Sequence, residues 1–246
     1  MFSSEKIKSL TGLNDVLVLA ETDSTNTFLK NQAKEKYEGA VIIAQRQTAG
    51  RGRLGRTFIS EKNGLYMSIF LKPEFQDITR ITTMAAVAVL RAIEKFSKKN
   101  AYIKWVNDIF LNDKKVSGIL TEGVFDGNCF IGAILGIGVN LFKPENGIDE
   151  SIKDIAGCVF EENSGIADEF ASCIINNFFE IYKNGNYIEE YRKKSFLTGK
   201  EVFYIKDGKE VFGRVLGIDD EFGLILKTEK EITVLKCGEV SVKTKS

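Results

Sequence analysis

The chain has 246 residues, of which 43% are hydrophobic and 28% charged, so it is long enough for one sizeable core with a small unit beside it. Basic and acidic residues both number 34, and this balance excludes an overall positive field that would draw the chain onto nucleic acid. Because no stretch approaches the roughly 20 apolar residues of a membrane span and the first residues carry no export signal, we expect a cytoplasmic protein without a membrane partner.

Histidine is absent, which excludes a Ser-His or Cys-His nucleophile pair and an imidazole zinc site. The cysteines are widely scattered, with no pair at the spacing of a metal knuckle: Cys129, Cys158, Cys173 and Cys237. In the cytoplasm they are expected to be reduced and mostly buried. Acid–base chemistry would have to come from carboxylates or lysines, so the residue content indicates a reaction run by positioning and charge.

The first half of the chain predicts strands alternating with helices. A strand is expected at 16–20, and the cap-forming residues at 23–26 should start a helix that carries Phe28, Leu29 and Ala33. Two further strands are expected at 40–45 and 65–71. The run 79–97 repeats apolar residues at i, i+3, i+4 and i+7, which predicts a buried helix.

The rest of the main body continues this pattern. Strands are expected at 102–105, 108–112, 115–124 and 129–139, with a hairpin turn at Asp126-Gly127-Asn128. Helices at 165–182 and 186–194 close the body. Together these elements predict an α+β fold in which helices pack on a mixed β-sheet.

From Gly199 the pattern changes to short strands separated by turn residues, with no helix. Strands are expected at 201–205, 210–218, 223–227 and 232–235. They predict a small β-barrel after a boundary near 196–200. We therefore expect two domains, at 1–198 and 199–246.

The loop at residues 49–56, Ala-Gly-Arg-Gly-Arg-Leu-Gly-Arg, is the most informative motif. Its glycines let the backbone lie close against a ligand, and its arginines bring permanently charged, planar forks to the same place. The predicted strands on either side indicate that the loop hangs from a sheet, where a binding site is expected. An anion is the ligand that such a loop would hold.

The sequence of this loop also suggests other kinds of site. It lacks the Lys-Ser/Thr of a Walker A loop, and its Gly-x-Gly-x-x-Gly spacing is not followed by the helix that dinucleotide binding requires. A solvated surface loop or an arginine-glycine patch for RNA remains open from the loop alone.

Two later segments also place polar residues among apolar ones. Lys104-Trp105-Val106-Asn107-Asp108 interrupts two apolar runs, and Lys115-x-x-Gly118 follows, with a glycine that allows close approach of a ligand. A plain hairpin with its turn at 112–114 would explain the first segment equally well. Gly136-x-Gly138-x-Asn140 is either a third part of a site or an ordinary strand end.

In combination and in this order, these segments resemble the catalytic domain of biotin protein ligases. The resemblance rests on Ser24-Thr25-Asn26, Gln47 with the Gly-Arg loop, Lys104-Trp-x-Asn-Asp108, Lys115-x-x-Gly118 and Gly136-x-Gly-x-Asn140. Residues from about 200 resemble the family's small SH3-like C-terminal domain, so nearly the whole chain is covered. Two departures are visible: Val106 stands where the family usually has Pro, and Phe58 where many members have Trp. The first would loosen the turn before Asn107, and the second offers a smaller ring face to adenine.

The resemblance implies an ATP-dependent ligase that activates biotin as biotinyl-AMP and passes it to one lysine of a biotin carboxyl carrier domain. Biotin, ATP and Mg²⁺ are the expected small molecules, and a carboxylase's carrier domain is the expected partner. About fifteen residues precede the first predicted strand, too few for the family's winged DNA-binding domain, so a stand-alone form that binds no DNA is expected. A homodimer is left open.

The resemblance also implies roles for individual residues. The biotin-binding set is Ser24, Thr25, Asn26, Gln47, Gly50, Arg51, Gly52, Arg53, Lys115 and Gly118. The ATP- and adenylate-binding set is Arg53, Arg56, Phe58, Asn107, Lys115 and Asn140. Lys115, Arg53 and Asp108 are the expected catalytic residues, and Asp108 is also the expected Mg²⁺ ligand. These residue types suit adenylation, which needs cations where a carboxylate meets a polyphosphate, and a shell that excludes water.

Two alternatives remain at this stage. A lipoate or octanoate ligase of the same superfamily would share the fold, although its sites lack the repeated Gly-Arg loop. An RNA-binding module with an SH3-like tail is the alternative from another class, and the balanced charge argues against it.

Overall fold

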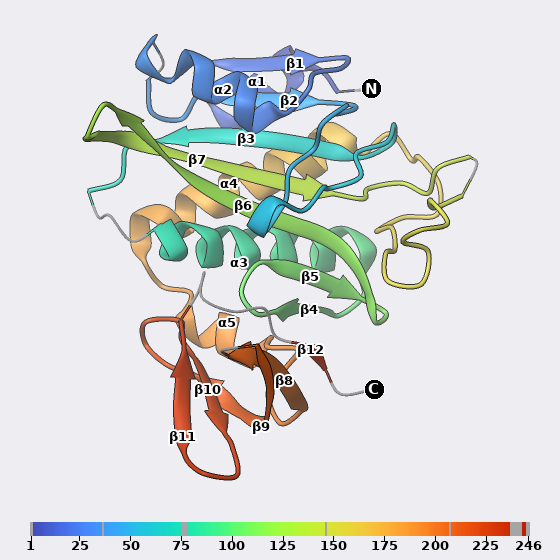
Figure 1. Cartoon of the computed structure of the whole chain (residues 1–246). Coiled ribbons are helices and arrows are strands. Elements are labelled where there is room, and N and C mark those ends of the chain that lie inside the picture. Colours follow the sequence, from blue (N-terminus) through green and yellow to red (C-terminus); the bar gives the residue numbers. More distant parts are fainter. Residues whose placement is uncertain are drawn as a thin grey trace.

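The structure is a computed structural model that describes residues 2–35, 37–74, 78–145, 147–206, 208–236 and 243–244. A seven-stranded sheet in the order β1-β2-β3-β7-β6-β5-β4 forms the larger part, and a five-stranded sheet in the order β11-β10-β9-β8-β12 forms the smaller part (Figure 1). The strands of the larger sheet are β1 (Val16–Leu19), β2 (Val41–Ala44), β3 (Leu65–Leu71), β4 (Ala101–Lys104), β5 (Asp108–Leu111), β6 (Lys114–Asp126) and β7 (Cys129–Val139). Those of the smaller sheet are β8 (Glu201–Lys206), β9 (Lys209–Ile218), β10 (Leu224–Lys227), β11 (Ile232–Leu235) and β12 (Lys243–Thr244).

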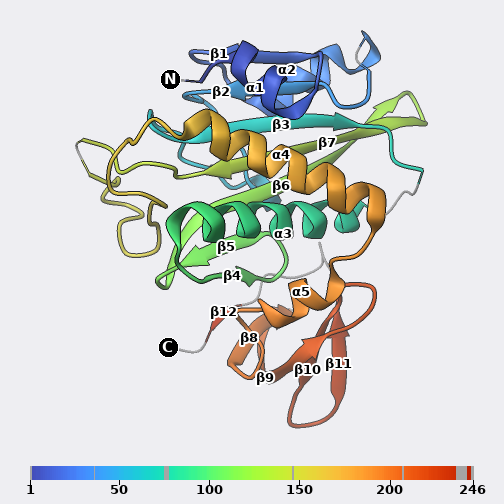
Figure 2. The ribbon, with the colours of Figure 1, turned by 180° about the vertical axis from the view of Figure 1, so that it is seen from behind.

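Helices cover both faces of the larger sheet. The α-helices are α1 (Ser4–Thr11), α2 (Thr25–Gln32), α3 (Ile78–Ser97), α4 (Ala167–Asn184) and α5 (Ile188–Lys193), and the short 3₁₀ helices are η1 (Ala33–Glu35) and η2 (Arg53–Gly55). Seen from behind, α1, α3 and α4 lie in front of the sheet (Figure 2). Helix α2 packs on the opposite face, where Leu29 contacts a separate apolar cluster that includes Phe70 and Ile134.

The sheet is mixed because β1 pairs parallel with β2, while the remaining neighbours are antiparallel. Strand β3 is buried along its whole length, as expected for a strand covered on both faces. Alternate residues therefore join different cores: Met67 and Ile69 pack toward α3 and α4, and Phe70 packs toward α2. The α2 face keeps Ser68, a buried polar residue, close to the site described below.

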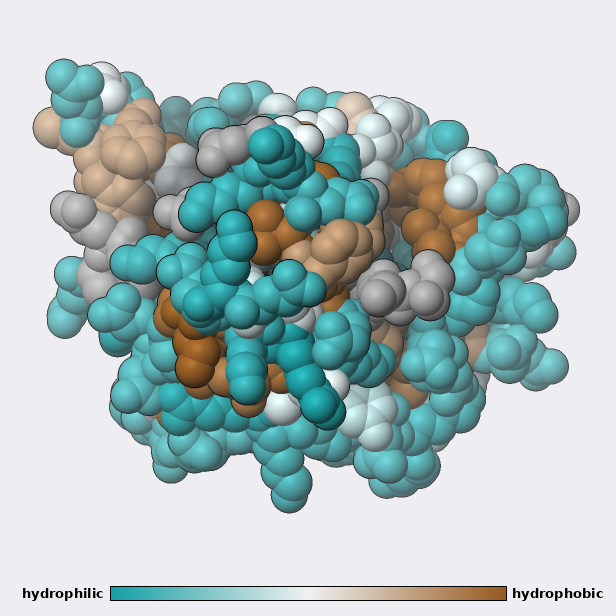
Figure 3. All heavy atoms as spheres, turned by 60° about the horizontal axis from the view of Figure 1, so that its bottom comes forward, coloured by the Kyte–Doolittle hydropathy of each residue, from teal (hydrophilic) through white to brown (hydrophobic). Residues whose placement is uncertain are grey.

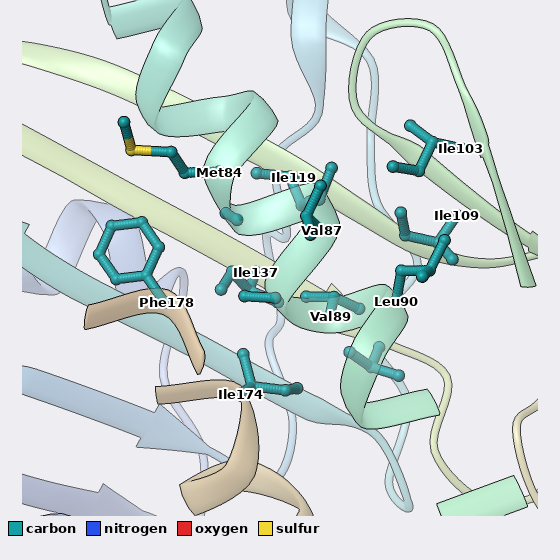
Figure 4. Packing of buried hydrophobic residues seen from close by; sticks show 14 of the residues in the cluster. Met84, Val87, Val89, Leu90, Ile103, Ile109, Ile119, Ile137, Ile174 and Phe178 are labelled. Carbon is teal, nitrogen blue, oxygen red and sulfur yellow. The ribbon is translucent and has the colours of Figure 1, made fainter. Parts of the chain in front are cut away.

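Helix α3 forms the centre of the main core. Its side chains pack between strands β5 to β7 and helix α4, as the close view of Leu90, Ile119 and Ile174 shows (Figure 4). Each fully buried aliphatic side chain of this kind stabilises the fold by about 1.5–3 kcal/mol. The apolar residues whose 3.6-residue repeat predicted this helix therefore form the face that meets the sheet.

The smaller sheet contacts the larger one through the turn between β9 and β10. Trp105 donates from its indole Nε1 to the carbonyl oxygen of Phe222 at 2.8 Å, and Tyr187 stacks on the Phe222 ring with the centroids 5.4 Å apart. On the end of the molecule that carries the smaller sheet, apolar patches lie among polar side chains (Figure 3). Ile232 and Ile205 are exposed there.

The predicted α+β fold with a mixed sheet is confirmed, whereas the closed barrel is not. In the described residues the smaller sheet is open, with β11 and β12 at its edges. Helix α1 was not predicted, although Ser3 as its N-cap and Gly12 as its left-handed C-cap are readable signals.

Two further expectations concern cysteines and membranes. The expectation of mostly buried cysteines is wrong for the described ones: Cys129 is exposed, and Cys158 and Cys173 are half-buried free thiols. Cys129 is exposed because it opens β7 next to the Gly127 turn. Cys237 lies outside the described residues. No helix in the described part of the chain is long and apolar enough to cross a membrane.

Candidate active site

A cavity of about 420 Å³ lies on the α2 face of the larger sheet. It is bounded by the first turn of α2, by the loop at 49–56 and by strands β5 to β7. Of the fifteen residues predicted for the site, thirteen line it: Ser24, Thr25, Asn26, Gln47, Arg51, Gly52, Arg53, Arg56, Phe58, Asn107, Asp108, Lys115 and Gly118. Segments that are distant in sequence therefore meet in one place.

At one end of the cavity the side chains are uncharged and joined by hydrogen bonds. Ser24 is the N-cap of α2, and the next residue, Thr25, donates its backbone N–H to Gln47 Oε1 at 2.8 Å. Gln47 in turn donates from Nε2 to Ser60 Oγ at 2.9 Å. Ser68 Oγ lies 2.8 Å from Thr25 Oγ1. Because these groups hold one another, the donors and acceptors facing the cavity are fixed before any ligand enters.

Asn26 links this end to the charged residues beside it. Its Oδ1 lies 2.6 Å from Ser68 Oγ, and its Nδ2 donates to Glu122 Oε2 at 2.8 Å. Glu122 also pairs with Arg51, its Oε1 lying 3.0 Å from the guanidinium Nη2. Ser60, Ser68 and Glu122 were not predicted as site residues.

Glycines on two paired strands make room for these side chains. A Cβ on Gly136 would lie 2.2 Å from Asn26 Oδ1, and one on Gly138 would lie 2.8 Å from the Phe58 ring. At Gly118, on the neighbouring strand, a Cβ would lie 3.0 Å from the same ring. These positions need glycine because the backbone is the floor of the cavity.

At the other end a chain of polar contacts connects the loop to strands β5 and β6. Arg53 Nη1 donates to Asn107 Oδ1 at 3.0 Å, and Asn107 Nδ2 donates to Asp108 Oδ1 at 3.2 Å. Lys115 Nζ lies 2.7 Å from the same Asp108 oxygen and 5.8 Å from the centroid of the Phe58 ring. The side chains of Lys115 and Asp108 are only 32% and 25% exposed, so their charges are screened less than those of a surface pair.

The lining of the cavity is strongly cationic. Five lining side chains are cations, Arg51, Arg53, Arg56, Lys104 and Lys115, and Asp108 is the one carboxylate among the lining residues. Burial lowers the pKa of Lys104, an effect that nearby Asp108 opposes and that Lys115 and Lys200 reinforce. Such an excess of positive charge in a concave site favours a polyanion. Among the described residues no group of three or more acidic, cysteine or histidine side chains could hold a metal ion.

Buried residues hold the turn that carries Asn107. Trp105 is 7% exposed and lines the cavity, and the peptide bond between Trp105 and Val106 is cis. Tyr191 of α5 donates its hydroxyl to the Val106 carbonyl at 3.0 Å. Val106, which departs from the family pattern, is fully buried.

Gly50 and Asn140 do not line this cavity. Gly50 packs against the segment that follows the loop, where a Cβ would lie 2.3 Å from the Phe58 carbonyl oxygen. Asn140 donates from Nδ2 to the Gly157 carbonyl at 3.0 Å and borders a smaller neighbouring cavity. Its side chain is therefore engaged by the 155–158 segment.

The lining also includes residues that were not predicted for the site: Leu54, Thr57, Lys104, Trp105, Ile119, Leu120, Gly136, Ile137, Gly138 and Ile155. Several, such as Leu54, Thr57 and Ile119, directly adjoin a predicted residue in the sequence, and this adjacency was an available signal. Ile155 carried no such signal, because only the folded path of the 150–157 segment places it there.

Comparison with known proteins supports one family. Residues 18–140 match the model of the biotin/lipoate A/B protein ligase family. The bifunctional ligase/repressor BirA of Bacillus subtilis is 31% identical over 236 residues, which are 92% of this chain and 72% of that protein. The biotin–[acetyl-CoA-carboxylase] ligase of Paracoccus denitrificans is 29% identical over 236 residues, covering 91% of this chain and 98% of that protein.

A solved structure agrees with the sequence relatives. The biotin protein ligase of Aquifex aeolicus in complex with biotin and ATP superposes with a TM-score of 0.81 at 28% identity, covering 95% of this chain and 100% of that one. The described fold thus agrees with the family match. The chain belongs to the biotin/lipoate A/B protein ligase family, on its branch of biotin protein ligases.

Proposed function

We propose that this chain is an ATP-dependent biotin–protein ligase. A carboxylate oxygen of biotin attacks the α-phosphorus of ATP, pyrophosphate leaves, and biotinyl-AMP remains bound. The amine of a carrier lysine then attacks the acyl carbon, forming an amide and releasing AMP. The observation that carries the proposal is one cavity that joins an uncharged, hydrogen-bonded end to a cationic end.

The uncharged end suits the ureido ring of biotin. A neutral ring with two N–H donors and one carbonyl is recognised by fixed neutral partners, because an unpaired buried polar group would cost binding free energy. We assign this role to Ser24, Thr25, Asn26 and Gln47. Gly118 leaves room for the ligand, and Gly50 and Gly52 shape the loop above it.

The cationic end suits the phosphates. Arg53 and Arg56 would bind phosphate oxygens, since a guanidinium fork matches their geometry. Lys115 stands where the biotin carboxylate meets the α-phosphate, and Arg51 extends the positive charge toward the biotin end. Phe58, which faces Gly118 and Gly138, would lie against the adenylate. Asn107 would contact adenine or ribose, and the same role for Asn140 would require its side chain to leave Gly157.

Asp108 is proposed as the carboxylate that serves Mg²⁺ and the acceptor lysine. A single carboxylate suits Mg²⁺, which is commonly held by one or two carboxylates together with substrate phosphates. When bound, the ion would neutralise charge on the phosphates. Once pyrophosphate has left, the same carboxylate can align the incoming lysine amine by exchanging its contact with Lys115.

Other parts of the proposal concern the whole molecule. We propose that residues 199–246 form an SH3-like domain after a catalytic domain at 1–198, supported by the antiparallel order of β8 to β11. The partner is the carrier domain of a carboxylase. A homodimer fits the edge strand β1, where Leu17 is exposed. The balanced charge argues against DNA as a partner, and the use of ATP fits a cytoplasmic location.

Calorimetric titration with biotin, lipoate and RNA in turn tests the assignment. Of these three ligands, only biotin should bind, and it should do so with 1:1 stoichiometry. When ATP is added to the biotin complex, the enzyme should release pyrophosphate. Binding of lipoate with pyrophosphate release would support the lipoate ligase alternative. Binding of RNA without pyrophosphate release would overturn the enzyme assignment.

A further inference from the structure

Glu122, in the middle of β6, joins two parts of the site without lining the cavity. Its Oε1 lies 3.0 Å from Arg51 Nη2 of the 49–56 loop, and its Oε2 accepts from Asn26 Nδ2 at 2.8 Å. The Glu122 side chain is 19% exposed, whereas that of Arg51 is 48% exposed. One carboxylate therefore connects an exposed loop residue to a partner in the protein interior.

The interior partner is held on every side. Asn26 is 5% exposed, its Nδ2 also reaches the Leu120 carbonyl at 3.4 Å, and its Oδ1 lies 2.6 Å from Ser68 Oγ. Any side chain at Gly136 would collide with it. Asn26 thus fixes the position of Glu122, and Glu122 in turn fixes the position of the Arg51 guanidinium.

Two arginine side chains link the loop to other segments of the site. In the described structure, Arg53 reaches Asn107 at the cationic end, and Arg51 reaches Glu122 at the uncharged end. Beyond Arg53 the backbone has positive φ angles at Leu54 and Gly55 and folds back on itself, with the Gly52 N–H donating to the Arg56 carbonyl at 2.7 Å. The two arginines therefore hold the loop at separate ends of the cavity.

The chemistry of the pair suits a contact that can open. A guanidinium has five N–H donors, so Arg51 can hold Glu122 and still present donors to the cavity. An ion pair that is half exposed on one side is weak enough to break when ligands exchange. Because Glu122 is largely buried, the pair is nevertheless screened less than two exposed charges would be.

We propose that Glu122 is a positioning residue that holds the 49–56 loop closed over the biotin end by fixing Arg51 against Asn26. This inference rests on the proposed function and adds a residue to it. Glu122 touches no substrate. Its effect is to slow the escape of biotin and of biotinyl-AMP before the carrier lysine arrives.

Glu122→Gln tests the proposal, since it removes the charge and keeps the shape. Biotin measured by stopped flow should dissociate about three- to tenfold faster, the range expected for a partly buried ion pair. Adenylation at saturating biotin and ATP should stay within about twofold, because the groups that surround the phosphates are intact. Released biotinyl-AMP should label added albumin, seen on a streptavidin blot. Trypsin should cut more rapidly at Arg51 and Arg53 in the biotin-bound variant.

Glu21→Gln is the matched control. Glu21 pairs with Arg46 at 2.6 Å in a segment that leads into the loop, and neither residue lines the cavity. This variant also removes one ion pair and should leave biotin dissociation, albumin labelling and trypsin cutting as in the wild type.

A double-mutant cycle shows whether Glu122 acts through Arg51. In an Arg51→Gln background, Glu122→Gln should accelerate biotin dissociation no further, because the partner is already gone. An equal acceleration in both backgrounds, or wild-type dissociation and selectivity in the single variant, would overturn the proposal. If thermal melting shows that Glu122→Gln folds poorly, Glu122→Asp replaces it. The shorter aspartate carboxylate cannot reach both Arg51 and Asn26, so biotin and biotinyl-AMP should escape from this variant in the same way. Failure of the wild type to form biotinyl-AMP would instead count against the proposed function.

Discussion

The two ends of the cavity are built by different physical means. At the uncharged end, Thr25, Gln47 and Ser60 are buried or half-buried, and hydrogen bonds of 2.8 and 2.9 Å connect them in a row. At the cationic end, Arg53, Asn107, Asp108 and Lys115 carry full charges or contact them, and they are more open to solvent. One end is fixed by mutual hydrogen bonds and the other by opposed charges.

This difference predicts how each end should recognise its ligand. Fixed neutral groups discriminate by shape and by the number of hydrogen bonds, since a ligand lacking one leaves a buried group unpaired. Clustered cations act over a longer range and stabilise negative charge that develops during a reaction. We therefore expect specificity to reside mainly at the first end and rate enhancement mainly at the second.

The largest expected effect is at the cationic end. Lys115→Ala should raise the barrier to biotinyl-AMP formation by about 2–4 kcal/mol, as expected when a preorganised charge is removed from a reacting centre. Pyrophosphate release measures this step. Lys114→Ala is the control, because Lys114 Nζ contacts the Asp154 carbonyl outside the cavity. Near wild-type adenylation by Lys115→Ala would show that the charge at this position is dispensable.

A smaller effect is expected at the uncharged end. Gln47→Ala removes the acceptor of the Thr25 N–H and the donor to Ser60, and it should weaken biotin binding by about 1–3 kcal/mol because buried groups lose their partners. Calorimetry with biotin measures the loss, and the KM for ATP should not change. Gln45→Ala, two residues earlier and outside the cavity, should bind biotin normally. A parallel loss of ATP affinity would show that the two ends are not independent.

Much of the fold followed from periodicity, and much of the site from motifs. The apolar repeat of α3 and the turn at Gly127 depend on local sequence, so their prediction required no knowledge of the folded chain. The plain hairpin considered for 108–118 is present, with its turn at Asn112 and Asp113, and it lines the cavity as well. A structural and a functional interpretation of one segment were therefore compatible.

What could not be predicted depends on contacts between distant segments. Glu122 is one of 34 acidic residues, and nothing in its neighbourhood shows that it meets Arg51 and Asn26. Ile155 likewise reaches the cavity only through the path of its loop. Asn140 stands in a site-like motif, yet its side chain donates to the Gly157 carbonyl and does not line the cavity. Short-range patterns identify candidates, and long-range packing decides which of them meet.

The smallest expected effect is the response to salt, which separates the two ends without any substitution. At the cationic end the Lys115 side chain is 32% exposed, so mobile ions can screen part of its charge. Raising KCl from about 0.05 to 0.5 M shortens the Debye length from over 10 Å to below 5 Å, and the KM for ATP should rise several-fold. Biotin carries a single negative charge and should respond less, and the neutral amide of biotin should bind almost unchanged. If ATP, biotin and biotin amide, measured by calorimetry across the same salt series, weakened equally, the division into an uncharged and a cationic end would be wrong.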